Sequence, residues 1–339
     1  MGHATRTDLI LDKLNEKYDI HIFASERAYK YLSNKFDNVH EIYGFNTVYK
    51  NNGVSNVRTF LRGIIRFPRD IISNLLTFWK VSREIKPNII VSDFECYSSI
   101  YSNLTGLPLI SINNMNIMTK CEIKYPFKYI ISKIKAEIII RLFIIRAKRY
   151  IILTYFYPKV KNNEDTILYP PVLRKEISSL KPISGDYVLV YQTSKSNFKL
   201  LETLKEIDDK FIIYGFNVNK RDKNLVFKEF NESDFFIDME NAKAVITNGG
   251  FTLISEALHL KKPIYSNPIR GQFEQTMNAI YLEELGYGVF NESIDKESIE
   301  EFLNNLDKYQ EKVDEYDSGS NKHVIRELEE SIRKYAINK

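Results

Sequence analysis

Short apolar runs alternate with longer helix-like segments along almost the whole chain, and this alternation constrains the fold more than any other feature. Runs of four or five residues rich in Ile, Val, Leu and Tyr predict strands, and the segments between them have helical spacing. The predicted strands span residues 20–24, 88–92, 109–112, 150–154, 187–191, 211–214, 244–247 and 263–266. The predicted helices span residues 6–17, 57–84, 128–149, 198–207, 252–259, 275–285, 298–306 and 322–335. This alternation indicates parallel sheets in an α/β fold.

A proline-rich connection divides the predicted strands into two groups. Residues 157–186 contain prolines at 158, 170, 171 and 182 and a glycine at 185, a composition typical of an interdomain linker. The sequence therefore predicts two Rossmann-like domains, at residues 1–175 and 176–320, followed by a C-terminal helix at 321–339.

The first predicted domain begins with a turn-like Gly2-His3 and no preceding strand, although a doubly wound domain normally opens with a central strand. Two explanations are open: a start downstream of the true one, or a domain that lacks its first strand. We expect the former, because losing a central strand would expose two unpaired strand edges.

Composition excludes several classes of protein. Apolar residues form 44% of the 339-residue chain and charged residues 27%, which argues against disorder. The net charge of +4 is too small to indicate a nucleic-acid binder. Cys96 and Cys121 form no CxxC pair, and the five histidines form no HExxH motif, so we expect no disulfide, metal or cofactor. Without a signal pattern or an uncharged apolar run of membrane-spanning length, the sequence predicts a cytoplasmic protein.

The segment of residues 244–258 carries the clearest chemical signal. A predicted strand ends at Thr247, Gly249 and Gly250 follow, and a helix starts near Thr252. Bare backbone and a helix N-terminus at the end of a strand can bind a phosphate without a metal. Glu256 lies one turn further, where its carboxylate can accept hydrogen bonds from a ribose diol. The alternative is an ordinary strand–turn–helix with a solvated glutamate.

A second segment, residues 262–288, ends another predicted strand at a loop that presents Glu274 and Gln275 before a helix. This pair can hydrogen-bond a polyhydroxylated ligand. The alternative is a helix N-terminus with residues that favour that position.

The order of these residues resembles the donor-site signature of GT-B glycosyltransferases, in the branch of the UDP-glycosyltransferases and the MurG-type N-acetylglucosaminyltransferases. Residues 2–6, 90–94 and 191–194 also resemble that branch, and the resemblance is greatest to a predicted archaeal and bacterial subgroup with GxGHATR and VYQTS segments. It covers nearly the whole chain. The donor-site residues that match are Gly249, Gly250, Thr252, Ser255, Glu256, Pro268, Glu274, Gln275, Asn278 and Gly286.

The resemblance implies a GT-B fold, with two domains facing a central cleft, and a role for each matching residue. Glu256 would bind the donor ribose, and Glu274 and Gln275 would hold sugar hydroxyls. The donor-binding set is completed by Thr193 and Ser194 beside the pyrophosphate, with Gly249, Gly250 and Thr252, by Asn278, and by Gly215 beside the base. His3 would be the general base and Asp93 would orient it; an imidazole of ordinary pKa suits that task.

The implied reaction moves a sugar from a nucleotide-diphosphate donor, expected to be UDP-linked, to a hydroxyl of a glycan or lipid-linked acceptor. A single displacement assisted by a base would invert the anomeric carbon, and the resemblance implies no metal. Two alternatives remain open: a UDP-sugar 2-epimerase-like enzyme and a non-catalytic nucleotide-sugar-binding subunit.

Residues 120–149 combine nine Lys or Arg and two Glu with many isoleucines. A basic face with apolar neighbours can lie on an anionic membrane, so one expectation is peripheral contact with the inner membrane face through this segment. The alternative is a core helix with snorkelling lysines. We expect no nucleic-acid partner.

Overall fold

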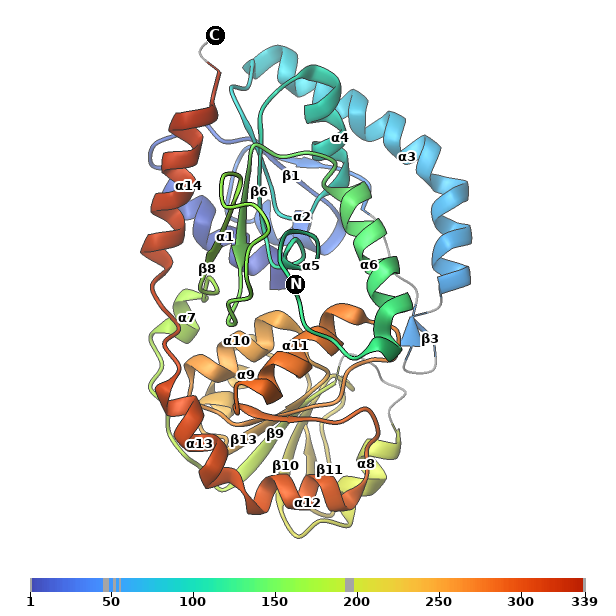
Figure 1. The fold of residues 1–339 in the computed structure, drawn as a ribbon, viewed down its shortest axis with the longest axis vertical. Coiled ribbons are helices and arrows are strands. Elements are labelled where there is room, and N and C mark those ends of the chain that lie inside the picture. Colours follow the sequence, from blue (N-terminus) through green and yellow to red (C-terminus); the bar gives the residue numbers. More distant parts are fainter. Residues whose placement is uncertain (1, 45–48, 51–52, 55, 193–197, 338–339) are drawn as a thin grey trace.

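A computed structural model of the chain describes residues 2–44, 49–50, 53–54, 56–192 and 198–337 (Figure 1). Side chains are described for residues 6–44, 69–192 and 198–337. The molecule has two lobes, each built on parallel strands with helices packed around them, one above the other in Figure 1.

The second half of the chain forms one seven-stranded sheet. Its spatial order is β11-β12-β10-β9-β13-β14-β15, and every pairing except that of β11 with β12 is parallel. Numbered along the chain, the parallel strands lie in the order 3-2-1-4-5-6 of a doubly wound nucleotide-binding fold. The strands are β9 (Tyr187–Tyr191), β10 (Lys210–Tyr214), β11 (Lys220–Asp222), β12 (Leu225–Phe227), β13 (Ala244–Thr247), β14 (Ile264–Ser266) and β15 (Gly288–Phe290).

Two helices of this half begin at residues whose side chains satisfy their first amide groups. The Asn231 side chain caps α9 and the Asp295 side chain caps α12, which removes unsatisfied donors at each start. The helices are α8 (Phe198–Lys205), α9 (Glu232–Glu240), α10 (Phe251–His259), α11 (Phe273–Glu284), α12 (Lys296–Asn304) and α13 (Leu306–Glu315).

The first half has two separate parallel sheets, β1-β2 and β5-β6-β7-β8, and a hairpin of β3 and β4. The strands are β1 (Ile22–Ala24), β2 (Val39–Glu41), β3 (Tyr49–Lys50), β4 (Gly53–Val54), β5 (Ile90–Ser92), β6 (Leu109–Asn113), β7 (Arg149–Leu153) and β8 (Thr166–Tyr169). The α-helices are α1 (Gly2–Leu14), α2 (Glu26–Leu32), α3 (Asn56–Ile85), α4 (Cys96–Thr105), α5 (Ile117–Lys120), α6 (Ile130–Phe143) and α7 (Lys175–Ser178). A 3₁₀ turn, η1, spans Phe127–Tyr129.

Two sequence expectations in this half are wrong. The helix predicted over residues 128–149 ends at Phe143, because β7 takes Arg149 onward into the sheet beside β6 and buries Tyr150 and Ile151. The residues predicted as a linker, 157–186, include β8, which pairs with β7 in parallel. A four-residue strand surrounded by prolines gives too weak a pattern to be recognised.

The last helix, α14 (Asn321–Tyr335), packs against α1 and β7 in the first half (Figure 1). Lys17 pairs with Glu329 at 2.7 Å, and Arg149 pairs with Glu327 at 2.9 Å. The chain therefore crosses from the second lobe back to the first before it ends.

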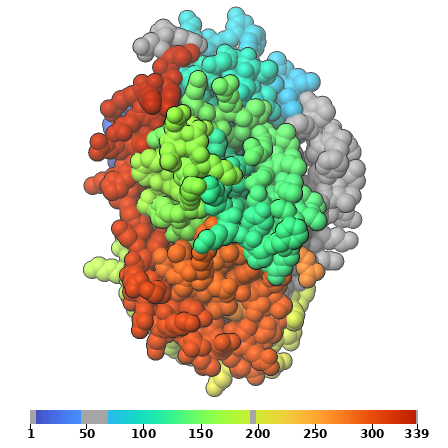
Figure 2. Space-filling view, in the orientation of Figure 1, coloured from blue at the N-terminus to red at the C-terminus, as the bar shows by residue number. Residues whose placement is uncertain are grey.

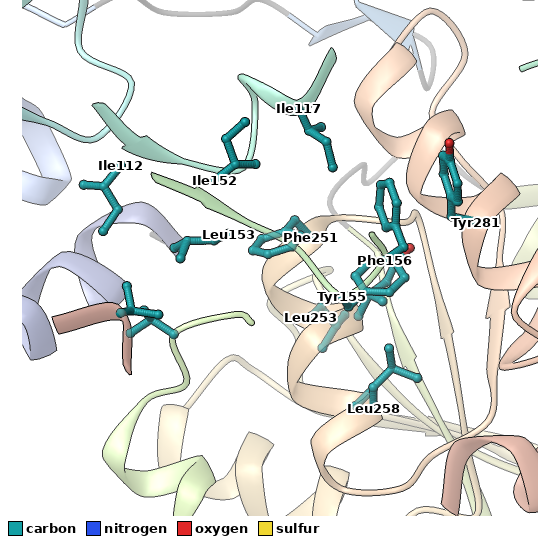
Figure 3. Close-up of a cluster of buried hydrophobic side chains, with 14 of the residues drawn as sticks. Ile112, Ile117, Ile152, Leu153, Tyr155, Phe156, Phe251, Leu253, Leu258 and Tyr281 are labelled. Atoms are coloured by element: carbon teal, nitrogen blue, oxygen red, sulfur yellow. The ribbon is translucent and has the colours of Figure 1, made fainter. Parts of the chain in front are cut away.

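An apolar cluster joins the two lobes (Figure 3). Tyr155 and Phe156 follow β7, and the Phe156 ring stacks on Tyr281 of α11 with centroids 4.0 Å apart. Tyr155 faces Phe251 of α10 at 6.4 Å and donates a hydrogen bond to the Asn278 carbonyl. These two aromatic residues therefore position both helices that carry the predicted donor-site residues.

Candidate active site

The two predicted donor-site loops follow strands that lie side by side in the second sheet. β9 is the first of the parallel strands of this sheet in chain order and β13 the fourth, and they are direct neighbours. The order of strands reverses between them, and α/β folds bind their ligands at such a switch point. Gly249 and Gly250 follow β13, whereas Thr193 and Ser194 follow β9 and lie outside the described residues.

The turn after β13 is closely packed against α11. Gly249 has a φ of +88°, and a Cβ there would lie 2.9 Å from both the Gln275 carbonyl and the Ser266 hydroxyl oxygen. Asn278 donates its side-chain amide to the Gly249 carbonyl at 3.0 Å. Asn278 therefore holds the turn in place. The sequence predicted it only as a donor-binding residue.

The N-terminus of α10 faces this turn without a side-chain cap. Its N-cap, Gly250, has open space where a Cβ would be. Thr252, in the first turn, is half-buried. Uncapped amides at the positive end of a helix dipole favour an anion such as a diphosphate.

Glu256 is buried and forms a bidentate ion pair with Arg174, whose Nε and Nη2 lie 2.7 and 2.8 Å from the two carboxylate oxygens. Arg174 also pairs with Glu232 at 2.5 Å and lies over the Phe236 ring. Burial raises the pKa of the Glu256 carboxyl to about 7, and the Arg174 guanidinium acts in the opposite direction. The carboxylate predicted to bind a ribose is thus already engaged by an arginine.

A small cavity of about 10 Å³ lies where the two lobes meet at α10. Arg6 of α1, Arg174, Thr252 and Glu256 are among its lining residues. A volume of this size holds about one water molecule. The lobes must therefore separate, or Arg174 must move, before a nucleotide can reach Glu256.

Asp93 follows β5 in the first lobe and is held by α1. Arg6 donates Nη2 to Asp93 Oδ1 at 2.5 Å and Nε to Oδ2 at 3.3 Å, and the Thr7 hydroxyl donates to Oδ2 at 2.9 Å. The next residue, Phe94, has a φ of +57° and stacks on Phe143. A bulky residue in the left-handed region is strained backbone of the kind found at functional sites.

A chain of polar contacts links Asp93 to Glu274 across the two lobes. Arg6 Nη1 lies 3.5 Å from Asn114 Oδ1, and Asn114 Nδ2 donates to Glu274 Oε1 at 2.7 Å. The helix that carries His3 is thereby connected to the start of α11, where the predicted sugar-binding residues lie. His3 itself belongs to α1, but its side chain lies outside the described residues.

The two remaining predicted donor-site residues, Gln275 and Gly215, contact the protein's own main chain. Gln275 is buried and accepts a hydrogen bond from the Ile269 amide through Oε1 at 2.8 Å. Gly215 has a φ of +107°, and a Cβ there would lie 1.8 Å from the Gln192 carbonyl oxygen. Gly215 therefore allows the ends of β9 and β10 to approach closely.

Sequence reasoning gave no role to four residues that the site uses: Arg6, Asn114, Tyr155 and Arg174. Arg6 stands in the GHATR segment, and Asn114 stands in a loop between a strand and a helix, so both had a local signal. Tyr155 and Arg174 had none, because neither stands in a recognisable motif. All four residues act on partners more than 80 positions away in the chain.

Within the described residues, no cluster of three or more His, Cys, Asp or Glu could hold a metal ion. Among the helices in that part of the chain, none has the length and apolarity needed to span a membrane.

The sequence profile of glycosyl transferase family 1 matches residues 1–307, and the chain belongs to this family. No curated protein matches the sequence.

Solved glycosyltransferase structures share the fold. A Phytolacca americana UGT2 complexed with UDP-2fluoro-glucose and pterostilbene has a TM-score of 0.71 at 12% identity, over 99% of this chain and 97% of that one. The MurG of Acinetobacter baumannii has a TM-score of 0.60 at 14% identity, over 97% and 96%. A kitacinnamycin glycotransferase has a TM-score of 0.66 at 13% identity, over 98% and 94%. The expected GT-B fold is confirmed.

Proposed function

We propose that this glycosyltransferase moves a sugar from a UDP-sugar to an acceptor hydroxyl, with inversion and without a metal. The observation that carries the proposal is the switch point of the second sheet. There the uncapped N-terminus of α10, the Gly249–Gly250 turn and Glu256 lie together. The structural relative from Phytolacca americana, which has the same fold, is complexed with a UDP-sugar analogue.

In this proposal the second lobe binds the donor and the first lobe activates the acceptor. In the second lobe, α10 amides bind the diphosphate, Glu256 binds the ribose, and Glu274 and Gln275 hold the transferred sugar. The leaving diphosphate gains charge in the transition state, and α10 amides aimed at that charge accelerate the step. Arg174 and Arg6 line the adjacent cavity, and the proposed reaction uses no metal.

In the first lobe, His3 removes the acceptor proton while the acceptor oxygen attacks the anomeric carbon. Asp93, held by Arg6 and Thr7, orients the imidazole and stabilises its charged form. One displacement from the face opposite the leaving group inverts the anomeric configuration. The acceptor is a glycan or a lipid-linked acceptor, reached from the first lobe.

The proposal is tested by titration calorimetry with UDP, UDP-glucose and UDP-N-acetylglucosamine, followed by mass spectrometry of UDP release with and without EDTA. We expect micromolar to millimolar binding, EDTA-insensitive turnover with an acceptor, and an inverted anomeric proton by NMR. Binding without UDP release would indicate a non-catalytic subunit, and a changed sugar with no acceptor would indicate an epimerase.

A further inference from the structure

The side of α6 that faces away from the protein carries an unusual row of exposed apolar residues. Ile131, Ile134, Ile138 and Leu142 are 66%, 47%, 52% and 64% exposed, at positions i, i+3, i+7 and i+11 of one helix. Phe127 before the helix is 84% exposed, and Ile145 after it is 52% exposed. The opposite side holds Ile140, which is fully buried. Adjacent apolar side chains of this size in contact with water mark an interaction surface. We name Phe127, Ile131, Ile134, Ile138, Leu142 and Ile145 the α6 outer face.

Cations flank this face, and the nearby acids are neutralised by partners. Lys135 and Arg141 are exposed on α6, and Arg146 and Lys148 are exposed just beyond it. In the described part of the chain these four cations form no ion pair. By contrast, Glu137 pairs with Lys133 at 2.9 Å, Glu122 with Lys159 at 2.9 Å, and Glu284 with Lys124. The surface around the α6 outer face is therefore apolar in its middle and net positive at its margins.

The cations of residues 120–149 do not all fall on one side when the segment is projected as a single helix, and the structure explains why. Lys133 lies on the side of the helix opposite to Lys135, and its side chain is largely buried against Glu137. Arg146 and Lys148 follow the end of α6 at Phe143 and do not obey helical spacing. When Lys133, Arg146 and Lys148 are excluded from the helical projection, the remaining residues of α6 form one apolar face with cations at its edges.

We infer that the α6 outer face docks on the surface of a bilayer that contains anionic lipid. Bilayer docking accounts for both features: the isoleucines enter the acyl boundary, and the long Lys and Arg side chains reach the headgroup phosphates. The face is one side of a single exposed helix on the outside of the molecule (Figure 2). A fluid, negatively charged surface matches a row of apolar side chains with cations on both flanks.

The docked face would lie beside the proposed active site. At its lower end in Figure 1, α6 reaches the second lobe, where Lys128 and Tyr129 both contact Glu292 and the Lys124 amide donates to the Tyr281 hydroxyl at 2.9 Å. At its other end, Phe143 stacks on Phe94, the neighbour of Asp93, with ring centroids 5.1 Å apart. This inference goes beyond the proposed function, because it predicts where the enzyme works and does not depend on which sugar is transferred.

The test is co-sedimentation of the full chain with phosphatidylcholine vesicles that contain either no charged lipid or about a third phosphatidylglycerol. We expect binding to the anionic vesicles, at least tenfold weaker binding to the neutral ones, and weakening at high salt as charges are screened. The variant Ile131→Gln/Ile138→Gln/Leu142→Gln should lose at least tenfold in affinity, and Lys135→Glu/Arg141→Glu should lose the preference for anionic lipid.

The matched control is Leu104→Gln/Ile183→Gln/Ile237→Gln, which removes three residues of comparable exposure (71%, 48% and 53%) elsewhere on the surface. It should bind as the unchanged chain does, and thermal unfolding should show that all variants fold. Equal loss in the control, equal binding to both vesicles, or no binding at all would overturn the inference. So would light scattering that shows a dimer which the α6 triple variant converts to a monomer.

Discussion

The two halves of the molecule share a fold pattern but place their site residues by different means. In the second half, one continuous sheet holds β9 and β13 together over four residue pairs, and glycines at the strand ends shape the site. In the first half, the described strands form two separate parallel sheets and a hairpin. β5, which leads to Asp93, pairs only with β6 among the strands described, and its Val91 is 39% exposed.

The difference shows that backbone and side chains can substitute for one another in building a site. Substitutions of Gly215 and Gly249 should be poorly tolerated, because an added Cβ at either position meets a main-chain carbonyl. Asp93 is instead held by Arg6 and Thr7, which come from α1. We therefore expect backbone substitutions to be most harmful in the second half and side-chain truncations to change turnover most in the first.

The largest expected effect is on turnover and tests the first half. Replacing the proposed base, His3→Ala, should lower kcat by about 10²–10⁴-fold, the usual contribution of a positioned proton acceptor. The calorimetric Kd for UDP should stay within about twofold, because the second lobe binds the nucleotide. Unchanged turnover would remove His3 from the mechanism.

The next effect is on stability and tests the second half. A Cβ at Gly215 would lie 1.8 Å from the Gln192 carbonyl oxygen in a residue with φ of +107°, so Gly215→Ala should lower the free energy of unfolding by about 3 kcal/mol. The matched control is Gly106→Ala in the first half. There φ is +74° but space is open, so about 1 kcal/mol is expected. Urea denaturation measures both, and equal losses would contradict the comparison.

A third prediction concerns the pH dependence of donor binding. The carboxyl of Glu256, with a pKa raised to about 7 by burial, accepts hydrogen bonds from both hydroxyls of a ribose diol only when both of its oxygens are unprotonated. UDP affinity should therefore fall as the pH is lowered through 7, because protonation turns one accepting oxygen into a donor and removes the negative charge. Calorimetry at a series of pH values should also show Glu256→Gln binding about tenfold more weakly at pH 8, with no step near neutrality. A step that persists in this variant would assign the titration to another group.

The smallest effect tests the connection between the halves. Asn114→Ala removes the hydrogen bond to Glu274 and should lower kcat/KM about fivefold, equivalent to about 1 kcal/mol. Asn103→Ala removes an amide that bonds only within its own helix and serves as the control. If both variants retain full kcat/KM, the two lobes do not cooperate through this contact.

Local pattern was sufficient to predict much of the fold. β9 and β13 have the bounds that the sequence predicted, because a buried central strand is a continuous apolar run with clear ends. The strands β8, β11 and β15 gave no usable period and were missed. Similarly, residues 144–153 mix apolar residues with three cations and gave no sign of where the helix ends and the strand begins.

The candidate site likewise has one part that local sequence predicts and another part that it does not. The Gly249–Gly250 turn and Glu256 were predicted correctly as a strand–turn–helix unit because their neighbours in sequence are also their neighbours in space. The partners of those residues were not. Arg174 reaches Glu256 across 82 positions, and Asn114 reaches Glu274 across 160.

By itself, the amino-acid sequence determined the family, the α/β alternation and the residue types at the donor turn, since each depends on residues close together in the chain. Only the tertiary structure decided that an arginine closes over Glu256, that Asp93 is held by α1, and that one side of α6 faces water. These properties depend on which distant segments pack together. Burial and charge compensation arise from such packing, and local sequence does not encode them.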